Sequence, residues 1–415
     1  MDSEQQIIVG NRPNDSHSFP DNWQLRSLGE ITTSSQYGIS SSSGGNYSLP
    51  ILKMNNLQDG HIDFRDLDFI QLSKAEMESL MLNKGDLLIN RTNSIDLVGK
   101  AAIYDLEDEH VFASYLVRFR LGPSVLPTFV NYYLNSEPGQ RKLKLLATQG
   151  VSQANINPSI LKKRLFIPIP PILEQHRIVE ILCSLDLSIN LTTQLITKKR
   201  NIKQATMQQL LTGKTRLPGF SGERKVKKLG EIGEKFVNGG TPSTQKPEYW
   251  QGNIPWITGA DVINQKISDI RRFITREAVQ NSSTNIVERG NLLLVTRTGV
   301  GKLALAPFDV AISQDITGIY VKKGQALVEY LFHYFNYNSE SLKSLNQGTS
   351  IAGITRETLL STNVYLPSFL EQQAIADILT DMDAEIVALE QKRDKTRALK
   401  QGMMQELLTG KTRLV

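Results

Sequence analysis

The chain has 415 residues, 40% of which are hydrophobic, and a formal net charge of +5 at pH 7. This length predicts two or three soluble domains, and the small basic excess favours an acidic partner such as nucleic acid only weakly. The single cysteine, Cys183, excludes an intramolecular disulfide framework and a multi-cysteine metal site, which fits a reducing cytosol. No run approaches the roughly 18 apolar residues of a membrane span, and no signal region opens the chain, so we expect a cytoplasmic protein without a membrane partner.

Residues 1–20 are polar and lack a regular period, so we expect a flexible N-terminal tail. A first globular domain is predicted over residues 21–170. Within it the apolar run Leu87–Ile89 follows a turn and predicts a buried strand. Apolar residues alternate with arginines over Val117–Leu121, which predicts a strand with the arginines on one face, and a helix is expected over Pro127–Asn135.

A long amphipathic helix is predicted over residues 171–217. Its apolar residues recur at spacings of four and three, the heptad pattern of a helix that packs against another helix. Prolines before Glu174 end any earlier helix, and the carboxylate of Glu174 suits the positive end of the helix dipole. Gly213 suits the left-handed residue that ends a helix. The seam residues of this helix are Ile178, Leu182, Leu185 and Ile189.

A second globular domain is predicted over residues 218–367, and a second long helix over residues 368–415. The segment Glu371–Leu414 repeats Glu174–Leu217 nearly unaltered, at an offset of 197 positions (371 − 174). A repeat of this kind indicates a duplicated structural unit. The seam residues of the second helix are Ile375, Leu379, Met382 and Ile386.

The repeat extends beyond the helices, because the Leu-Gly-Glu-Ile at Leu28–Ile31 recurs at Leu229–Ile232. The helices match better than the domains, so we interpret the helices as a shared frame and the domains as two different readers. A two-fold relation between the copies closes such an assembly, and if its axis is perpendicular to the helices they run antiparallel. We therefore predict two α/β (α+β) globular domains, separated by two long antiparallel helices that form a coiled coil, with an internal pseudo-two-fold repeat.

Catalytic motifs are missing from the sequence. Gly213-Lys214-Thr215 lacks the earlier glycine and the preceding strand of a P-loop, and Gly299–Lys302 lacks the rest of either phosphate-binding pattern. The five histidines are scattered and have no spacing suited to a metal ion. Asn157-Pro158-Ser159 lacks the second proline and the aromatic residue of an amino-methyltransferase motif. We predict no catalytic residue, no metal site and a chain that is not an enzyme.

The diverged domains offer residue types that suit contacts in a DNA groove: arginine for guanine, asparagine or glutamine for adenine, and serine, threonine or lysine for phosphate. Taken singly, each is more often an ordinary surface residue, and its recurrence in both copies is what favours DNA binding. The candidates in the first domain are Lys53, Asn55, Asn90, Arg91, Thr92, Asn93, Lys100, Gln149, Ser152, Gln153 and Asn155. The candidates in the second domain are Thr241, Thr258, Thr296, Arg297, Thr298, Lys302, Gln314, Gln347, Thr349 and Ser350.

Several motifs lie around the junctions between domains and helices. Pro168–Gln175 leads into the first helix, Leu210–Leu217 and Leu407–Leu414 are identical endings, and Gly239–Ser243 with Ile254–Trp256 lie early in the second domain. In these motifs the chain resembles the DNA specificity subunits of Type I restriction-modification systems, over nearly its whole length after the tail. The resemblance implies two target-recognition domains, each reading one half of a bipartite DNA sequence, and helices that set the spacer and dock methyltransferase subunits.

The resemblance also implies the partners: double-stranded DNA, two methyltransferase subunits and two restriction subunits. No cofactor would be bound by this chain, since S-adenosylmethionine would belong to the adenine methyltransferase, and ATP and magnesium to the restriction subunit. The seam residues of both helices are then expected to serve the subunit interface. Two alternatives stay open: a coiled-coil scaffold with two protein-interaction domains, which predicts no DNA affinity, and an enzyme that acts on nucleic acid by itself, which predicts turnover by the isolated chain.

Overall fold

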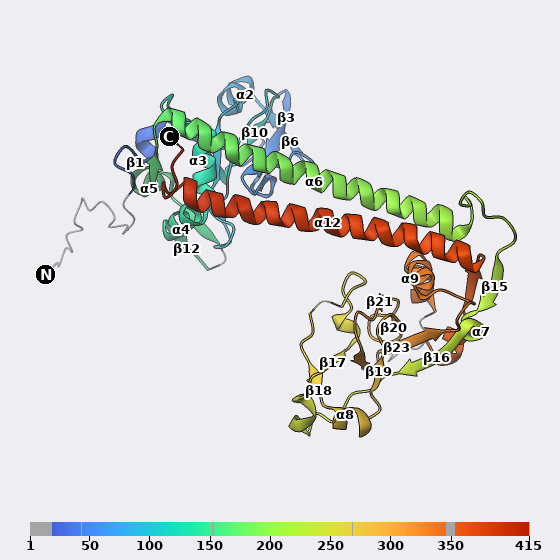
Figure 1. The fold of residues 1–415 in the computed structure, drawn as a ribbon. Coiled ribbons are helices and arrows are strands. Elements are labelled where there is room, and N and C mark those ends of the chain that lie inside the picture. Colours follow the sequence, from blue (N-terminus) through green and yellow to red (C-terminus); the bar gives the residue numbers. More distant parts are fainter. Residues whose placement is uncertain (1–18, 43, 152, 268, 346–352, 415) are drawn as a thin grey trace. The chain divides into compact units, whose positions relative to one another are not determined.

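The computed structural model describes residues 19–42, 44–151, 153–267, 269–345 and 353–414 (Figure 1). The chain divides into two compact units: unit 1 comprises Met1–Thr193 and Gln391–Val415, and unit 2 comprises Gln194–Glu390. Each unit therefore combines one globular domain with the beginning of one long helix and the end of the other. The expected N-terminal tail, residues 1–20, lies outside the described residues except for its last two.

The core of unit 1 is a four-stranded antiparallel sheet in the order β2 (Thr32–Tyr37), β11 (Leu116–Leu121), β7 (Leu87–Asn90) and β9 (Ala101–Ile103). Apolar side chains cover both of its faces. Leu87 and Ile89 pack in the cluster that includes Phe129 of the helix α3 (Pro127–Leu134). Leu88 and Leu116 pack in a second cluster on the other face. Burial of both faces explains why the run Leu87–Ile89 is apolar without interruption.

Two smaller sheets adjoin this core. One has the order β10 (Val111–Phe112), β3 (Tyr47–Leu52) and β6 (Asp68–Leu72), with β3 parallel to β10 and antiparallel to β6. The other has the order β12 (Ala147–Gln149), β13 (Ala154–Ile156) and β8 (Thr92–Asn93). The remaining short elements of this domain are β1 (Gln24–Ser27), α1 (Leu28–Ile31), η1 (Met54–Asn56), β4 (Leu57–Gln58), β5 (His61–Ile62), α2 (Lys74–Leu80), α4 (Glu137–Leu145), α5 (Pro158–Arg164) and β14 (Phe166–Ile169).

The strand predicted at Val117–Leu121 is confirmed as part of β11, but the face that carries its arginines is largely covered by the protein. Arg118 is 4% exposed and donates a hydrogen bond to the carbonyl of Met81 at 2.7 Å. Arg120 donates to the carboxylate of Asp86 at 2.9 Å. Arg118 is thus satisfied by protein acceptors, which include Gln36, because burial keeps water away from it. Arg120 keeps 36% of its side chain exposed beside Asp86.

Unit 2 repeats this plan. Its antiparallel central sheet has the order β16 (Gly233–Asn238), β23 (Ile316–Val321), β20 (Leu292–Val295) and β21 (Leu303–Leu305). A second sheet has the order β18 (Phe273–Ile274), β17 (Ile254–Ile257), β22 (Val310–Ile312) and β19 (Asn285–Val287). Helix α9 (Val328–Tyr337) takes the place of α3, and the helix predicted over Pro127–Asn135 is confirmed as α3. The remaining short elements are β15 (Lys225–Lys228), α7 (Leu229–Ile232), η2 (Pro247–Trp250), η3 (Gly259–Asp261), α8 (Arg276–Gln280), α10 (Ser339–Ser344), α11 (Arg356–Ser361) and β24 (Asn363–Leu366).

The two long helices are α6 (Ile172–Thr212) and α12 (Phe369–Leu407), drawn green and red in Figure 1. They run antiparallel within each unit. In unit 1 Lys400 donates to Asp186 at 2.6 Å, and in unit 2 the repeat-equivalent Lys203 donates to Asp383 at 2.6 Å. The left-handed residue after each helix is confirmed by a φ of 77° at Gly213 and, in the second copy, 75° at Gly410. The predicted fold class of two mixed domains with two long antiparallel helices and an internal repeat is confirmed.

The apolar seam pairs the beginning of one helix with the end of the other. Ile178 and Leu182 are 0% exposed and share a cluster with Met404, Leu407 and the first domain. The equivalent residues of α12, Ile375 and Leu379, are also 0% exposed and share a cluster with Met207, Leu210 and the second domain. The assignment of these four residues to a subunit interface is therefore wrong, because packing inside the chain leaves them no surface for a second protein. The assignment stays a prediction for the less buried Leu185, Ile189, Met382 and Ile386.

The predicted segment boundaries stay a prediction, because a compact unit is not one segment of the chain. The end of α12 and the C-terminal residues up to Leu414 belong to unit 1, together with the domain that opens the sequence. The last third of the chain thus contributes to both units.

By length and composition alone, α6 is long and apolar enough to cross a membrane. This corrects the expectation that no segment reaches that limit. Core helices of soluble proteins meet the same limit, and α6 carries the ion-paired Asp186 and the charged run Lys198–Arg200, which are costly in a bilayer core. The expected cytoplasmic location, without a membrane partner, stays a prediction.

Candidate nucleic-acid interface

The first group of candidate residues lies where strand β7 ends. Asn90 is fully buried, and its Oδ1 accepts a hydrogen bond from the Thr92 N–H at 3.2 Å. Thr92 is 7% exposed. Arg91 lies half-buried between them, with its guanidinium carbon 5.2 Å from the ring centroid of Tyr37. Of these three consecutive candidates, only Arg91 keeps a substantial part of its surface accessible to a ligand.

A small sheet continues from the end of β7. Its pairing places Gln149 opposite Ala154, and Asn155 opposite Thr92. Exposed Gln149, Gln153 and Asn155 therefore gather beside the half-buried Asn93, although they come from distant parts of the sequence. Candidate Ser152 lies outside the described residues. This hairpin brings amide side chains, which suit the edge of adenine, close to Arg91.

A hollow of about 560 Å³ adjoins the same strand ends. Lys53 lies at its edge and forms an ion pair with Asp68. Two aromatic residues of its lining are exposed, Phe69 at 69% and Tyr115 at 47%. Accessible aromatic rings beside lysine and asparagine side chains suit stacking on bases and hydrogen bonding to them. The residues that define the hollow include Ser40, Ser41, Ser42, Lys53, Asn55, Gln71 and Tyr115.

Lys100 is linked to Asn55 through the side chain of Gln58. Its Nζ donates to Gln58 Oε1 at 3.1 Å, and Gln58 Nε2 donates to the carbonyl of Asn55 at 2.8 Å. The structure thus brings Lys53, Asn55 and Lys100 into one region of the first domain.

In the second domain, Thr241 and Gln314 lie together at the surface. The Thr241 hydroxyl donates to Gln314 Oε1 at 2.6 Å, and the amide N–H groups of Gln314 take no part in this bond. Arg297 and Thr298 are also exposed, where the chain leaves β20. Candidates Gln347, Thr349 and Ser350 lie outside the described residues.

Other candidates of the second domain bond within the protein. The Thr258 hydroxyl donates to Asp261 at 2.9 Å and accepts from Arg272 at 3.2 Å. Lys302 Nζ lies 3.4 Å from the carbonyl oxygen of Gly259. Thr296 is 6% exposed, and its hydroxyl lies 3.2 Å from that of Thr317. Burial leaves Thr296, like Asn90 and Thr92, without the accessible polar atoms that a direct base contact needs.

Backbone hydrogen bonds show that the two strand exits are equivalent. The Arg91 N–H donates to the carbonyl of Tyr115 at 2.9 Å, and the Thr296 N–H donates to the carbonyl of Asp315 at 2.8 Å. The turns that begin at Lys53 and Thr258 are alike as well. The N–H group of each residue donates to a side chain three residues later, at 2.8 and 2.7 Å. The two domains thus present different side chains on the same backbone frame.

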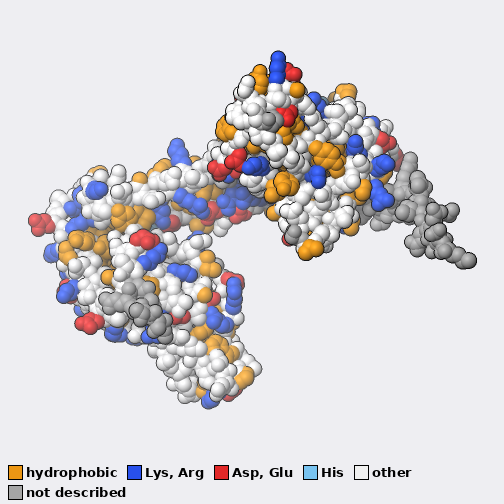
Figure 2. Space-filling view, turned by 180° about the vertical axis from the view of Figure 1, so that it is seen from behind, with side chains coloured by type: hydrophobic (Ala, Val, Ile, Leu, Met, Phe, Trp, Pro, Cys, Tyr) orange, Lys and Arg blue, Asp and Glu red, His pale blue; other side chains and the backbone are white. Residues whose placement is uncertain are grey.

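Charge alone does not mark the interface. On the face seen in Figure 2, basic and acidic side chains are interspersed, and hydrophobic side chains reach the surface in several places. The aromatic residues Tyr37, Tyr115 and Phe69 escaped the sequence reasoning, because aromatic residues in a strand pattern usually belong to the core. Only their exposure beside a basic residue identifies them.

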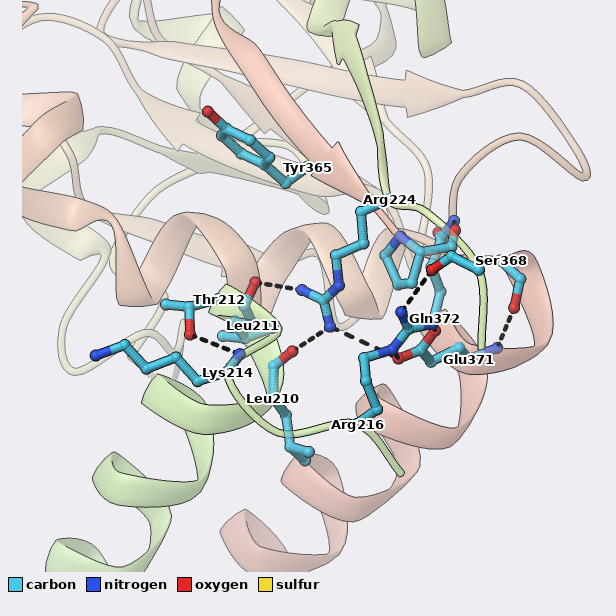
Figure 3. A network of polar contacts seen from close by, with 12 residues as sticks. Leu210, Leu211, Thr212, Lys214, Arg216, Arg224, Tyr365, Ser368, Glu371 and Gln372 are labelled. Carbon is cyan, nitrogen blue, oxygen red and sulfur yellow. Dashed lines mark hydrogen bonds and ion pairs between the residues drawn. The ribbon is translucent and has the colours of Figure 1, made fainter. Parts of the chain in front are cut away.

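A polar network at the helix ends supports the second domain (Figure 3). The Arg216 Nε donates to Glu371 at 2.7 Å, and this bond raises the pKa of the guanidinium. Arg224 donates to the carbonyls of Leu210 and Leu211 at 2.5 and 2.6 Å. The repeated Thr-Gly-Lys-Thr-Arg-Leu segment is therefore a helix end, as its sequence predicts, and the structure adds that its arginine binds the start of the other helix.

The first copy of the network lies in unit 1. Arg413 donates two hydrogen bonds to Glu174, both at 2.7 Å, and the Trp23 indole N–H donates to Glu174 at 3.1 Å. Burial by itself raises the pKa of the Glu174 carboxyl, but these donors outweigh it and the pKa is lowered. The C-terminal segment thus binds the start of α6 beside the first domain through Arg413. The segment before the second domain binds the start of α12 in the same way through Arg216.

Among the described residues, no group of three or more His, Cys, Asp or Glu side chains is placed to hold a metal ion.

Comparison with known proteins places these features in a family. The family model of the type I restriction modification DNA specificity domain matches the chain twice, over residues 20–199 and 222–397. The chain is 26% identical, over 415 residues and 95% of each protein, to a Methanocaldococcus jannaschii protein named as a type I restriction enzyme MjaX specificity subunit. It is 31% identical over 268 residues to the EcoR124I/EcoR124II specificity subunit of Escherichia coli, covering 61% of this chain and 63% of the relative. Its fold is similar to that of the S subunit of a Type-I restriction-modification system from M. genitalium, with a TM-score of 0.63, 16% identity and coverage of 96% and 98%.

Proposed function

We propose, for a chain that belongs to the type I restriction-modification DNA specificity family, that each of its two domains reads one half of a bipartite site in double-stranded DNA. The observation that carries this proposal is the pair of equivalent strand exits at Arg91 and Thr296, which share backbone hydrogen bonds and differ in side chains. Two readers on one frame give a specificity that is the sum of two short readings. Neither the family nor the fold supports the scaffold alternative.

The long helices set the distance between the two half-sites and dock the methyltransferase subunits. Support for docking comes from side chains that the seam does not use. On α6, Leu187 and Leu191 are 59% and 55% exposed, and Leu195 and Ile202 are 40% and 42% exposed. Large apolar side chains at this exposure are suited to burial by another protein. The internal repeat supports two methyltransferase subunits, one for each copy, and two restriction subunits beside them.

The chain contributes specificity and no catalysis of its own. S-adenosylmethionine belongs to the methyltransferase subunits, and ATP and magnesium to the restriction subunits. The absence of phosphate-binding and methyltransferase motifs from the sequence supports this division. A complex that acts on chromosomal DNA also favours a cytoplasmic location.

The test is to express this chain with a cognate methyltransferase subunit and to map methylated adenines in the host genome by single-molecule sequencing. We expect one split motif with a fixed gap, which is absent when the methyltransferase is expressed alone. Exchange of residues 21–167 for the first domain of another family member should then alter one half of the motif and spare the other half and the gap. Exchange of residues 218–367 is the matched control and should alter the opposite half. A methylation map that does not change with the chain, although both proteins are soluble and bound to each other, would refute sequence reading.

A further inference from the structure

Arg91 stands out because it is half-buried and its side chain has no polar partner among the described residues. It forms no ion pair, and its side chain donates no hydrogen bond to any described residue, while its Nε is buried without a partner. The two arginines of the neighbouring strand are satisfied instead, since Arg118 donates to Met81 and Arg120 to Asp86. A partly desolvated cation without an acceptor is costly unless a ligand supplies one.

The side chain of Arg91 also contacts an aromatic ring. Its guanidinium carbon lies 5.2 Å from the ring centroid of Tyr37, which is 50% exposed. The backbone of Arg91 is bonded to Tyr115, whose exposed ring lines the adjoining hollow. Tyr37 pairs with Val117, which comes two residues after Tyr115 in the sequence. The rings of Tyr37 and Tyr115 therefore lie at the same end of the sheet. The cation therefore lies beside a space that is rimmed by two accessible aromatic rings.

Polar atoms on both sides of Arg91 lack partners as well. The Nδ2 of Asn90 and the Oγ1 of Thr92 are buried and make no hydrogen bond in the described part of the chain. Buried polar atoms without partners are few in native proteins, and here they occur in three consecutive residues at one strand exit. Asn90 and Thr92 are buried, so Arg91 is the one of the three whose side chain an external group can reach. At the equivalent place in the second domain, apolar Val295 precedes Thr296, whose hydroxyl lies 3.2 Å from the Thr317 hydroxyl.

We propose that Arg91, held over Tyr37, reads a guanine in the half-site of the first domain by donating two hydrogen bonds from its guanidinium to the O6 and N7 atoms of the base. This inference rests on the proposed function and names one of its specificity determinants. A bidentate arginine is the commonest specific contact with guanine in the major groove. The contact with the Tyr37 ring restricts where the guanidinium fork lies, which a contact with a single phosphate oxygen does not require. Since Thr296 replaces the arginine in the second domain, the other half-site is read without this contact.

The experiment uses the full chain in complex with its methyltransferase subunit. Adenine methylation is mapped with the unaltered chain and with the Arg91→Gln and Arg91→Lys variants. Arg141→Gln serves as the control, because Arg141 is an exposed arginine of the same domain on α4 that lies outside the strand exit. The exchange of residues 21–167 identifies which half of the motif belongs to the first domain. Circular dichroism of each purified complex checks that the variants fold.

In the unaltered complex, the half-motif of the first domain should contain an obligatory guanine on one strand. Both Arg91 variants should relax that one position, lowering discrimination against other bases by roughly 10- to 100-fold, and should keep the second half-motif and the gap. Retention of the motif by Arg91→Lys, with an even loss of methylation at all sites in Arg91→Gln, would show a phosphate contact and overturn the inference. An unchanged motif in a folded Arg91→Gln complex would overturn it too. If the unaltered chain supports no split motif, the proposed function itself has failed, and that outcome is separate from any effect of Arg91.

Discussion

His333 makes the stability of unit 2 sensitive to acid. It is the one histidine in the sequence of unit 2, it is 1% exposed, and its Nε2 lies 3.2 Å from the hydroxyl of Thr380 on α12. Its Nδ1 is buried and makes no hydrogen bond with the residues that the structure describes. Burial, aided by the nearby charge of Lys203 and opposed by Asp383, lowers the pKa of His333 from 6.5 to about 4. The imidazole therefore stays neutral in the folded unit where it is protonated in the unfolded chain.

The magnitude follows from proton linkage. Above pH 6.5 both states hold a neutral ring, and the pKa difference has no effect on stability. Between pH 6.5 and pH 4 the unfolded state binds the additional proton, so the free energy of unfolding falls as the pH falls. With a pKa of about 4 in the folded state, unit 2 should lose about 2 kcal/mol between pH 8 and pH 5.

The assay is urea unfolding followed by tryptophan fluorescence at pH 8, 7, 6 and 5. Trp250 and Trp256 lie in unit 2 and Trp23 lies in unit 1, so the measurement uses a Trp23→Phe background in which both reporters belong to unit 2. The matched variant is His333→Tyr. At the equivalent position of unit 1, Tyr132 donates its hydroxyl to Asp186 at 2.7 Å, so the frame accepts this residue.

His333→Tyr should remove most of the loss between pH 8 and pH 5, because tyrosine does not titrate in this range. An unfolding free energy of the histidine protein that is constant over this range would refute the reasoning. So would an equal decline in His333→Tyr, which would assign the pH dependence to other groups.

Three further predictions concern the frame and the docking surface. Gly410→Ala should destabilise unit 1 by about 1–2 kcal/mol in urea unfolding, because φ is 75° there and a Cβ would lie 2.6 Å from Pro20 Cδ. The control Gly402→Ala should be neutral or stabilising, because its Cβ would meet no atom within 4 Å. In a double-mutant cycle, Asp186→Asn and Lys400→Met should show a coupling of about 1 kcal/mol that shrinks in high salt, and a coupling near zero would contradict a stabilising ion pair. Leu191→Asp should weaken binding of the methyltransferase subunit at least 10-fold by calorimetry. The unfolding free energy of the chain should not change, because Leu191 is 55% exposed. An unchanged affinity would place the docking surface elsewhere.

Features that depend on nearby residues were determined by the sequence. The prolines before Glu174 and the glycine at 213 predict the limits of α6, because helix ends are decided by local backbone geometry. The offset of 197 positions predicts the repeat, and the heptad spacing predicts that α6 has a helical partner. The run Leu87–Ile89 likewise predicts a buried strand.

The tertiary structure alone decided which partner buries each of these residues. Ile178 has the spacing of an interface residue, but the first domain and the end of α12 enclose it, and the end of α12 is more than 200 positions away in the sequence. Asn90 and Thr296 have polar side chains suited to DNA, yet the sheet geometry turns them inward. Arg91 differs from them because Tyr37, from another strand, holds it at the strand exit. Burial is a sum over contacts between distant segments, so a local pattern states what a residue can do, and the fold decides whether it meets a ligand.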